Sequence, residues 1–264
     1  MTDPAALARQ YLEQQRVLGG EIVIKSEAAE RSVTPKPTPE TTPLSPLPSP
    51  EVAPTVSTAL PPPGLTYDPP GGDLFSTDPI QQTRALDDIV QLVAGCTRCR
   101  LCEGRSTTVP GEGPRDARLV VVGEGPGKRE DETGRPFVGQ AGELLNKILA
   151  AIELPREQVY ICNVVKCRPP ENRTPLYDEI AACVPYLFRQ IELLAPTVIL
   201  AMGNTAAQTL LNTKQSLGAL RTKVHRFRNI PVIVTYHPAA LLRNPNWKKP
   251  TWDDVRIARR LLDA

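Results

Sequence analysis

The stretch Arg118-Leu-Val-Val-Val-Gly123 decides the fold class of this chain. An unbroken apolar run of this length, with turn residues on either side, is typical of a buried parallel strand. Similar runs predict further strands at 159–165, 197–202 and 231–236. Apolar residues at helical spacing predict helices at 84–95, 141–152, 176–194, 205–211 and 251–263. Strands that alternate with helices predict an α/β fold, a three-layer α/β/α sandwich around a mostly parallel central sheet.

The part of the chain before this pattern has a different composition. Of the 29 prolines in the 264 residues, 14 lie between Pro35 and Pro79. Such a segment has too little apolar surface to offset the entropy of ordering, so we expect 21–83 to be a disordered Pro-rich linker. Residues 1–20 predict a short helix that would dock a protein partner, with a frayed tail as the alternative. The folded domain is expected to span 84–264.

Charge and hydropathy divide the chain in the same way. Residues 1–83 contain 5 basic and 10 acidic side chains, whereas 84–264 contain 26 basic and 19 acidic ones. A basic domain favours a polyanionic partner. No apolar stretch approaches the ~20 residues of a membrane span. The first 20 residues lack the pattern of a signal peptide, so we expect a cytoplasmic protein whose thiols stay reduced.

Six cysteines accompany only two histidines. Cys96, Cys99 and Cys102 are crowded together, whereas Cys167 and Cys183 follow far downstream. Reduced cysteines at C-x2-C spacing, with two more downstream, indicate a metal site rather than disulfides. Cys162 lies in an apolar run, and we expect it to pack in the core.

Chemically suggestive residues follow the predicted strands. Gly123-Glu-Gly-Pro-Gly127 follows the first strand, Asn163 lies in the second and His237 follows the fourth. Ligands of parallel sheets bind beyond the carboxyl ends of the strands, so these segments are expected to meet. The glycine-rich stretch lacks the Lys-Ser/Thr of a phosphate-binding loop and the spacing of a dinucleotide fingerprint, so neither ligand is predicted.

Together these segments resemble the family 4 (iron–sulfur) uracil-DNA glycosylases, and the likeness covers roughly residues 86–264. The motifs that carry it are Cys96-x2-Cys99, Val122-Gly-Glu-Gly-Pro-Gly127, Gly134-Arg-Pro-Phe-Val-Gly-Gln-Ala-Gly142, Tyr160-Ile-Cys-Asn163, Val165-Lys-Cys-Arg-Pro-Pro170 with Asn172-Arg173, and Tyr236-His-Pro-Ala-Ala-Leu-Leu-Arg-Asn244.

The resemblance implies a monomer in the cytoplasm of a bacterium or archaeon. It would flip deoxyuridine out of DNA and hydrolyse the N-glycosidic bond, releasing uracil and leaving an abasic site. The alternative is a protein that binds uracil-containing DNA without turnover or traps it covalently through a histidine.

The resemblance also assigns the cluster ligands as Cys96, Cys99, Cys167 and Cys183, which would hold a [4Fe–4S] cluster. Zinc bound by four thiolates is the alternative metal. The spacing of Cys102 also fits a ferredoxin-type run, so this residue stays a further ligand candidate.

In the same way the resemblance implies a base pocket lined by Glu124, Gly125 and Pro126. Phe137 would stack on the base, with core packing as the alternative. The amide of Asn163 offers one donor and one acceptor, which match uracil O4 and N3–H, whereas cytosine presents the reverse pattern. The resemblance places His237 over uracil O2, where negative charge develops as the base leaves.

No motif of the sequence identifies the residue that would position or polarise the attacking water. The best-known branch of the superfamily carries an Asp in the loop after the first strand, and this chain does not. The candidates are Glu124, Glu130 and Asn172. For Glu130 the alternative is a solvated charge.

DNA contacts are expected from the loop after His237. Leu241 and Leu242 would insert into the vacated stack, with inward packing of a short helix as the alternative. Basic side chains that would hold phosphates are Arg243, Lys248, Lys249, Arg173 and Arg221. His225 lies in a basic stretch and is expected at the surface, facing DNA or solvent.

Overall fold

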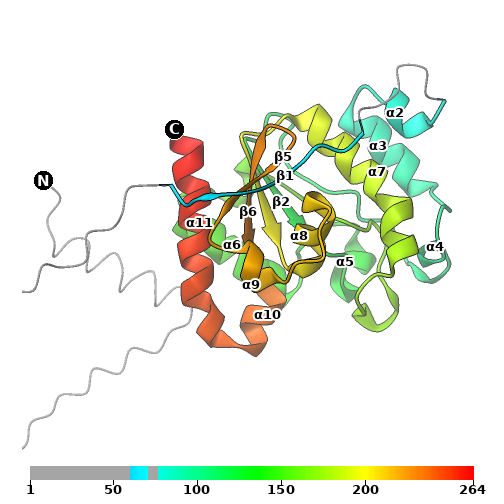
Figure 1. Cartoon of the computed structure of the whole chain (residues 1–264). Coiled ribbons are helices and arrows are strands. Elements are labelled where there is room, and N and C mark those ends of the chain that lie inside the picture. The colour runs from blue at the N-terminus through cyan, green and yellow to red at the C-terminus, as the bar shows by residue number, and fades with distance from the viewer. Residues whose placement is uncertain (1–59, 71–76) are drawn as a thin grey trace, which may run out of the picture.

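The fold is a six-stranded sheet between two layers of helices (Figure 1). The structure is a computed structural model, and it describes residues 60–70 and 77–264. The strand order is β1-β5-β6-β4-β2-β3, and only the pairing of β5 with β6 is antiparallel in this sheet of the described residues. The strands are β1 (Pro63–Tyr67), β2 (Leu119–Gly123), β3 (Val159–Asn163), β4 (Val198–Met202), β5 (Val224–Phe227) and β6 (Ile230–Thr235). The predicted fold class is confirmed.

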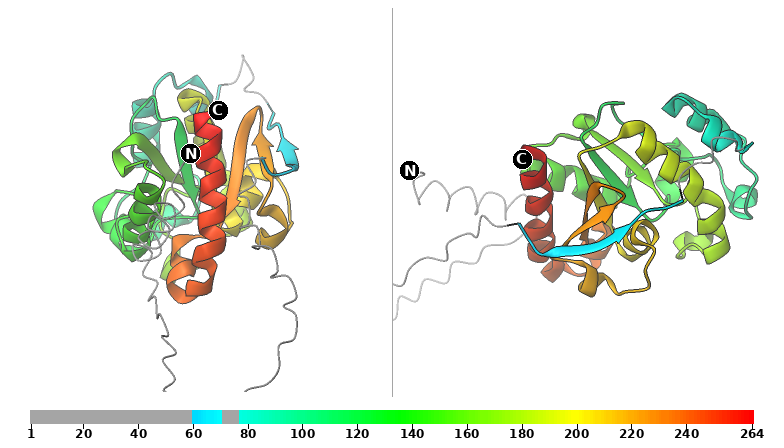
Figure 2. Two further views of the ribbon diagram at one scale, coloured as in Figure 1. Left: turned by 90° about the vertical axis from the view of Figure 1, so that its left-hand side faces the viewer. Right: turned by 45° about the horizontal axis from the view of Figure 1, so that its top comes forward.

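Side chains of one strand alternate between two separate cores. Val120 and Val122 of β2 pack with the helices α3 (Leu86–Ala94), α7 (Tyr177–Leu194) and α8 (Asn204–Leu211). Leu119 and Val121 point the other way and pack with α6 (Gln140–Ala151), α10 (Pro238–Arg243) and α11 (Lys248–Asp263). A central strand that is buried on both faces requires the continuous apolar run that the sequence shows. Figure 2 shows the helices on both sides of the sheet.

The remaining elements are short and connect the layers. They are α2 (Pro79–Gln82), α4 (Leu101–Gly104), α5 (Lys128–Thr133), α9 (Leu217–Leu220) and the 3₁₀ helices η1 (Arg156–Gln158), η2 (Pro170–Asn172) and η3 (Pro245–Trp247). In the part of the chain that the structure describes, we find no helix whose length and apolar character would suit a transmembrane span.

The folded domain begins earlier than the predicted boundary at residue 84, because two elements precede it. Strand β1 and helix α2 both lie inside the segment expected to be a disordered linker, so that prediction is wrong for these residues. β1 forms the edge of the sheet by pairing in parallel with β5. The predicted N-terminal helix at 1–20 lies outside the described residues.

His225 on β5 is also a correction, because it is buried rather than exposed. Its Nδ1 accepts a hydrogen bond from Leu65 N at 2.8 Å, and its Nε2 lies 2.6 Å from Leu220 O. Burial lowers the pKa of this imidazole. A Cβ on Gly64 would lie 2.4 Å from His225 Nδ1, so a glycine in β1 makes the room for the ring. His225 therefore joins β1 to the sheet and does not face DNA.

Candidate functional site

A large cleft opens at the edge of the sheet where β2, β3, β4 and β6 end. Its volume is about 1020 Å³. The side chains predicted to bind the base all line it, although they come from separate segments of the chain. They are Glu124, Gly125, Pro126, Phe137, Asn163 and His237.

The loop after β2 is fixed against β3. Gly123 is in register with Asn163, and Gly123 O accepts from Val164 N at 3.0 Å. Glu124 O accepts from Val165 N at 3.2 Å, so the main chain of the loop follows the continuation of β3. A Cβ on Gly123 would lie 2.4 Å from Asn163 Oδ1 and 2.6 Å from Phe137 Cζ. Glycine at this position is therefore required for the recognition amide and the aromatic ring to approach each other.

Asn163 lines the cleft and carries an unpaired polar atom. The residue is 1% exposed, and its side-chain oxygen Oδ1 is buried without a hydrogen-bond partner among the described residues. Leaving a buried acceptor unpaired costs about 1–3 kcal/mol. Lys166 Nζ donates to the main-chain oxygen of Asn163 at 2.7 Å and so holds the residue in place. The arrangement suits a ligand that brings its own N–H donor to Oδ1.

The ring of Phe137 packs in a tilted arrangement against the histidine that follows β6. The two ring centroids are 5.4 Å apart, with an angle of 31° between the ring planes. Phe137 is buried, and its backbone has φ of 51°, a left-handed conformation that is unusual for a bulky side chain. Such a backbone persists only when its surroundings hold it.

Arg156 holds this backbone. Its guanidinium donates to Pro136 O at 2.5 Å and to Phe137 O at 3.0 Å. It also donates to Glu112 Oε1 at 2.6 Å. Burial alone would raise the pKa of the Glu112 carboxyl, but hydrogen bonds from Arg135 and Arg156 lower it below its usual range, so the carboxylate stays ionised. Sequence reasoning missed Arg156, because it lies in a polar stretch without a motif.

His237 is the N-cap of α10, and its environment sets its protonation state. The pKa of the imidazole is lowered to about 4, chiefly by burial and also by the nearby charge of Arg243, whereas Glu130 acts in the opposite direction. The ring is therefore neutral at physiological pH. Nδ1 accepts from Ala239 N at 3.2 Å, so the single proton is on Nε2. His237 can thus donate a hydrogen bond from Nε2.

The three candidates for handling water occupy different environments. Glu124 is partly exposed and its carboxylate accepts from Thr205 Oγ1. Glu130 is buried and accepts from Val138 N and Gly139 N, both at 2.8 Å, so the alternative of a solvated charge is wrong. Asn172 is exposed at the rim of the cleft, and its Oδ1 accepts from Arg168 Nε at 2.8 Å.

The two leucines after His237 point in opposite directions. Leu241 is 1% exposed and packs in the core beside α6 and α11, so it cannot be a wedge. Leu242 is 48% exposed. The helical phase of α10 separates the two, because consecutive residues of a helix do not share a face.

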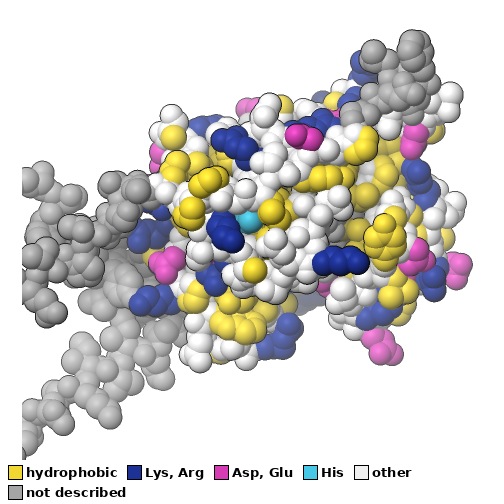
Figure 3. Space-filling view, in the orientation of Figure 1, with side chains coloured by type: hydrophobic (Ala, Val, Ile, Leu, Met, Phe, Trp, Pro, Cys, Tyr) yellow, Lys and Arg dark blue, Asp and Glu magenta, His cyan; other side chains and the backbone are white. Residues whose placement is uncertain are grey.

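The basic residues predicted to hold phosphates differ in whether they are already paired within the protein. Arg173 pairs with Glu179 at 2.7 Å and Arg221 pairs with Asp254 at 2.6 Å, so both are engaged within the protein. Arg243 is exposed and lines the cleft, whereas Lys248 is partly buried at the start of α11. Lys249 beside it is exposed. Figure 3 shows Lys and Arg side chains spread over one face of the molecule rather than gathered in a single patch.

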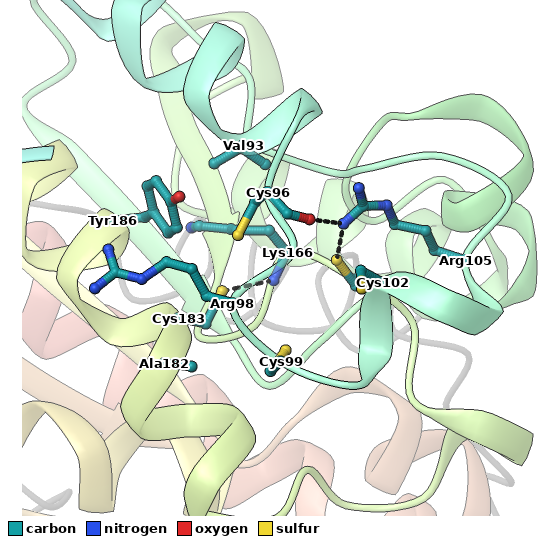
Figure 4. A pocket seen from close by; sticks show the side chains of 11 residues that line it. Val93, Cys96, Arg98, Cys99, Cys102, Arg105, Lys166, Ala182, Cys183 and Tyr186 are labelled. Atoms are coloured by element: carbon teal, nitrogen blue, oxygen red, sulfur yellow. Dashed lines mark hydrogen bonds between the residues drawn. The ribbon is translucent and has the colours of Figure 1, made fainter. Parts of the chain in front are cut away.

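Five of the cysteines line a second, much smaller cavity. Cys96 and Cys99 come from the segment between α3 and α4, Cys167 from the loop after β3 and Cys183 from α7. Figure 4 shows the side chains of Cys96, Cys99 and Cys183 directed into the same space. Cys102 also lines this cavity.

Nitrogen donors surround the cysteine cavity. Arg105 Nη1 donates to Cys167 Sγ at 3.2 Å, and Lys166 N donates to Cys183 Sγ at 3.3 Å. Burial raises the pKa of the Cys167 thiol, and it raises that of Cys183 to about 12. Within the described residues, no group of three or more His, Cys, Asp or Glu side chains is placed so that it could hold a metal ion.

Cys162 does not belong to this cavity. It is fully buried in the hydrophobic core beneath α3 and α7, as predicted. Lys166, by contrast, was not predicted to have a role. It is 1% exposed, and its Nζ donates to Asn163 O and to Gln190 Oε1, each at 2.7 Å. It lies between the base-pocket residue Asn163 and the cysteine cavity, which it also lines.

The fold and this cleft agree with the family to which the chain is similar. The family model of the uracil DNA glycosylase superfamily matches residues 110–257. The chain therefore belongs to the uracil-DNA glycosylase superfamily.

Individual relatives narrow this placement to the type-4 branch. The chain is 43% identical to a type-4 uracil-DNA glycosylase of Sulfurisphaera tokodaii, over 67% of this chain and 84% of the relative. It is 48% identical to a type-4 uracil-DNA glycosylase of Thermotoga maritima, over 60% of this chain and 84% of the relative. It is 42% identical to the type-4 uracil-DNA glycosylase of Archaeoglobus fulgidus, over 65% of this chain and 90% of the relative.

Proposed function

We propose that this protein is a DNA repair glycosylase, which hydrolyses the N-glycosidic bond of deoxyuridine in DNA to release uracil and leave an abasic site. The observation that carries the proposal is the buried, unpaired Oδ1 of Asn163 in a cleft beside Phe137 and His237. A nucleotide must leave the base stack to reach such a pocket, which costs a few kcal/mol.

Recognition follows from the amide of Asn163. Its Oδ1 accepts the N3–H of the flipped uracil, and its amino group donates to uracil O4. Cytosine has an acceptor at N3 and an amino group at C4. The amide oxygen of Asn163 would then face another acceptor, and its amino group would face another donor. Sites of this kind discriminate by about 10⁴-fold or more. Phe137 provides an apolar surface against which the base stacks, worth roughly 1–3 kcal/mol.

Bond cleavage places negative charge on the departing base. The neutral imidazole of His237 donates from Nε2 toward uracil O2, where that charge develops. Because the donor is already oriented by Ala239 N, little reorganisation accompanies the transition state. Water adds at C1′ as the C1′–N1 bond breaks, and the electron pair of that bond leaves with uracil.

Among the three candidates for handling the water, Glu124 fits the role best. Its carboxylate is partly exposed at the cleft and is oriented by Thr205 Oγ1, so it can accept the proton of the attacking water. Glu130 instead accepts from the backbone of Val138 and Gly139 and thereby holds the loop that carries Phe137. Asn172 at the rim is suited to a contact with the substrate sugar or phosphate.

The proposal extends to a [4Fe–4S] cluster held by Cys96, Cys99, Cys167 and Cys183. It is supported by the position of these four cysteines, with Cys102, around one cavity, and by N–H donors to two of the sulfurs. Such a cluster takes four thiolate ligands, and hydrogen bonds to its sulfurs tune it. When bound, it would tie the α3–α4 segment, the loop after β3 and α7 together. Zinc remains the alternative that metal analysis tests.

DNA contact is proposed for the exposed side of α10 and the segment after it. Leu242 would fill the space that the flipped nucleotide leaves, as apolar side chains do in other kinked duplexes. Arg243 and Lys248 would hold the phosphates on either side. Lys248 already has a partner within the protein, so Arg243 is expected to contribute more.

The test compares Asn163→Asp with the wild-type protein on oligonucleotides that contain one uracil or one cytosine. We expect uracil release to fall by about 10⁴-fold, because the introduced carboxylate repels uracil O4. We expect cytosine release to become detectable in this variant. Alkaline cleavage of the abasic product in single-turnover reactions measures both rates. The matched control is Asn229→Asp, an exposed asparagine in the β5–β6 turn, which should leave both rates unchanged.

Three results would contradict the proposal. If Asn163→Asp released uracil at the wild-type rate, Asn163 would not be the residue that recognises uracil. Tight binding of uracil-containing DNA by the wild-type protein without any alkali-labile product would instead indicate a binding protein. A DNA adduct that survives denaturation would indicate covalent trapping, for which buried His225 is unsuited.

A further inference from the structure

The cleft is much larger than its base pocket requires. Pockets for whole drug-sized ligands occupy about 300–1,000 Å³, and this cleft has about 1020 Å³. A single pyrimidine therefore leaves most of it unfilled. Apart from the base-pocket residues, the cleft is lined in part by residues of the α8–α9 connection and the α10–η3 segment, and Figure 1 shows α9 and α10 at the same end of the molecule. We call this part of the cleft the flanking lobe, and it is lined by Gln208, Lys214, Ser216, Tyr236, Arg243 and Trp247.

The charge of the flanking lobe suits a polyanion. The carboxylates that line the cleft belong to Glu124 and Glu130, both on the base-pocket side. Lys214 and Arg243 are exposed in the lobe, and neither forms an ion pair with a carboxylate of the described residues. Arg173 and Arg221, by contrast, are already paired. Phosphate groups are therefore the partners that the two cations of the lobe can take.

An aromatic platform forms one wall of the lobe. Trp247 stacks on Tyr236, with ring centroids 4.7 Å apart and an angle of 5° between the planes. The guanidinium of Arg221 lies 4.4 Å from the centre of the Tyr236 ring. Arg221 is itself fixed by Asp254 Oδ2 at 2.6 Å and by Pro250 O at 2.9 Å. The platform is thus rigid at its base.

The outer ring of this platform remains partly open. Trp247 is 37% exposed, although most large aromatic side chains of a small domain are covered. Its carbonyl accepts from Thr251 Oγ1 at 2.8 Å, which fixes η3 to the first turn of α11. An exposed indole held in one orientation beside unpaired cations is the arrangement on which proteins stack the bases of single strands.

We propose that the flanking lobe binds the nucleotide next to the flipped deoxyuridine in the same strand. This inference rests on the proposed function. The neighbouring base stacks on Trp247, and its phosphates contact Lys214 and Arg243. Trp247 lines the cleft, so a base that leaves the duplex to stack on it gives up its pairing, and the subsite favours DNA in which the neighbour is unpaired.

The subsite is tested by combining variants of Trp247 with oligonucleotides that lack one neighbouring base. Uracil release from a single-stranded oligonucleotide is measured for the wild-type protein, Trp247→Ala and Trp247→Phe. The measurement is repeated with the base on the 5′ side, or on the 3′ side, replaced by an abasic analogue. We expect Trp247→Ala to reduce kcat/KM roughly five- to a hundredfold on the intact oligonucleotide, mainly through KM. Trp247→Phe should retain most of the activity, because it keeps an aromatic face.

The abasic substrates identify the contact. On the oligonucleotide that lacks the stacked base, the wild-type protein and Trp247→Ala should have nearly equal kcat/KM. An equal loss for Trp247→Ala on all three substrates would overturn the proposal, since it would show a structural effect. No loss on any substrate would also overturn it. Absence of uracil release by the wild-type protein would be a failure of the proposed function instead.

The cations are tested through salt dependence. Lys214→Ala should lower the dependence of kcat/KM on salt concentration by roughly one phosphate contact. The matched control is Lys147→Ala, because Lys147 is an exposed lysine on α6 outside the cleft. An unchanged salt slope for Lys214→Ala would remove this residue from the subsite.

Discussion

The base pocket and the cysteine cavity are built in different ways. The pocket lies where parallel strands end, and burial together with one hydrogen bond sets the state of its imidazole. His237 is already neutral and carries its proton on Nε2. The cysteine cavity lies outside the sheet, and burial raises the pKa of the Cys167 and Cys183 thiols, which disfavours their thiolate forms. Thiolate ligands form there only when a metal supplies positive charge.

One short segment connects the two regions. Lys166 donates from Nζ to Asn163 O in the base pocket, and from its backbone N to Cys183 Sγ in the cavity. Lys166 therefore couples the position of Asn163 to the cysteine cavity. Damage to the cavity should alter the pocket, whereas loss of a pocket side chain from another segment, such as His237, should leave the cavity intact.

The largest expected effect is the loss of a cluster ligand. Cys167→Ala should abolish iron binding and visible absorption, lower the melting temperature and reduce uracil release, because the segment beside Asn163 loses its anchor. Metal analysis, absorption spectra and thermal unfolding measure these changes. The matched control is Cys162→Ala, a buried cysteine outside the cavity, which should keep its iron. Full iron content in Cys167→Ala, or stoichiometric zinc in the wild-type protein, would refute the ligand assignment.

His237→Asn comes next and tests whether the pocket acts alone. We expect kcat to fall by about 10²- to 10³-fold, because the donor to uracil O2 is displaced. Iron content and visible absorption should be those of the wild-type protein. Single-turnover uracil release measures the first effect and metal analysis the second. A loss of iron would mean that the pocket also supports the cavity.

The protonation of His237 gives a prediction for stability. Its pKa is about 4 in the folded protein and 6.5 as an ordinary value, so between these pH values the unfolded chain binds a proton that the folded chain does not. The free energy of unfolding should therefore fall as the pH is lowered from about 6.5 to about 4. Urea unfolding of the wild-type protein and of His237→Asn measures this. The pKa of His225 is shifted in the same direction, so the difference between the two proteins isolates His237.

The smallest expected effect concerns the support of Phe137. Arg156→Met removes the donors to Pro136 O and Phe137 O. We expect a loss of about 2–4 kcal/mol in the free energy of unfolding and roughly tenfold slower uracil release. The matched control is Arg135→Met, which removes the other partner of Glu112 but no contact with Phe137, and should change neither quantity. Equal effects of the two variants would show that Glu112, not the Phe137 backbone, matters.

The central strands could be predicted from the sequence, because a strand buried on both faces must be apolar throughout. β1 and β5 could not. β1 lies in a proline-rich stretch, and β5 has exposed Arg226 between buried His225 and Phe227. A polar pattern of this kind looks like a surface loop until its partner strand is known. Leu241 and Leu242 are equally apolar, and the packing of α10 on the core decides which one is exposed.

In the cleft, too, some residues could be predicted from the sequence and others could not. Asn163 and His237 could be identified from their positions after apolar runs, since parallel strands end at one edge of a sheet. Arg156 and Lys166 could not, because their roles arise from contacts with carbonyl groups that any residue carries. Local sequence contains no signal for such contacts.

The order of residues along the chain was enough to identify the chemical groups of this protein: the apolar strands, the cysteine spacing, and an amide and an imidazole at strand ends. The state of those groups depends on the folded arrangement. It buried the Oδ1 of Asn163 without a partner, fixed the proton of His237 on Nε2 and opened a lobe beside Trp247. The physical reason is that desolvation and hydrogen-bond geometry depend on neighbours in space, which are far apart along the chain.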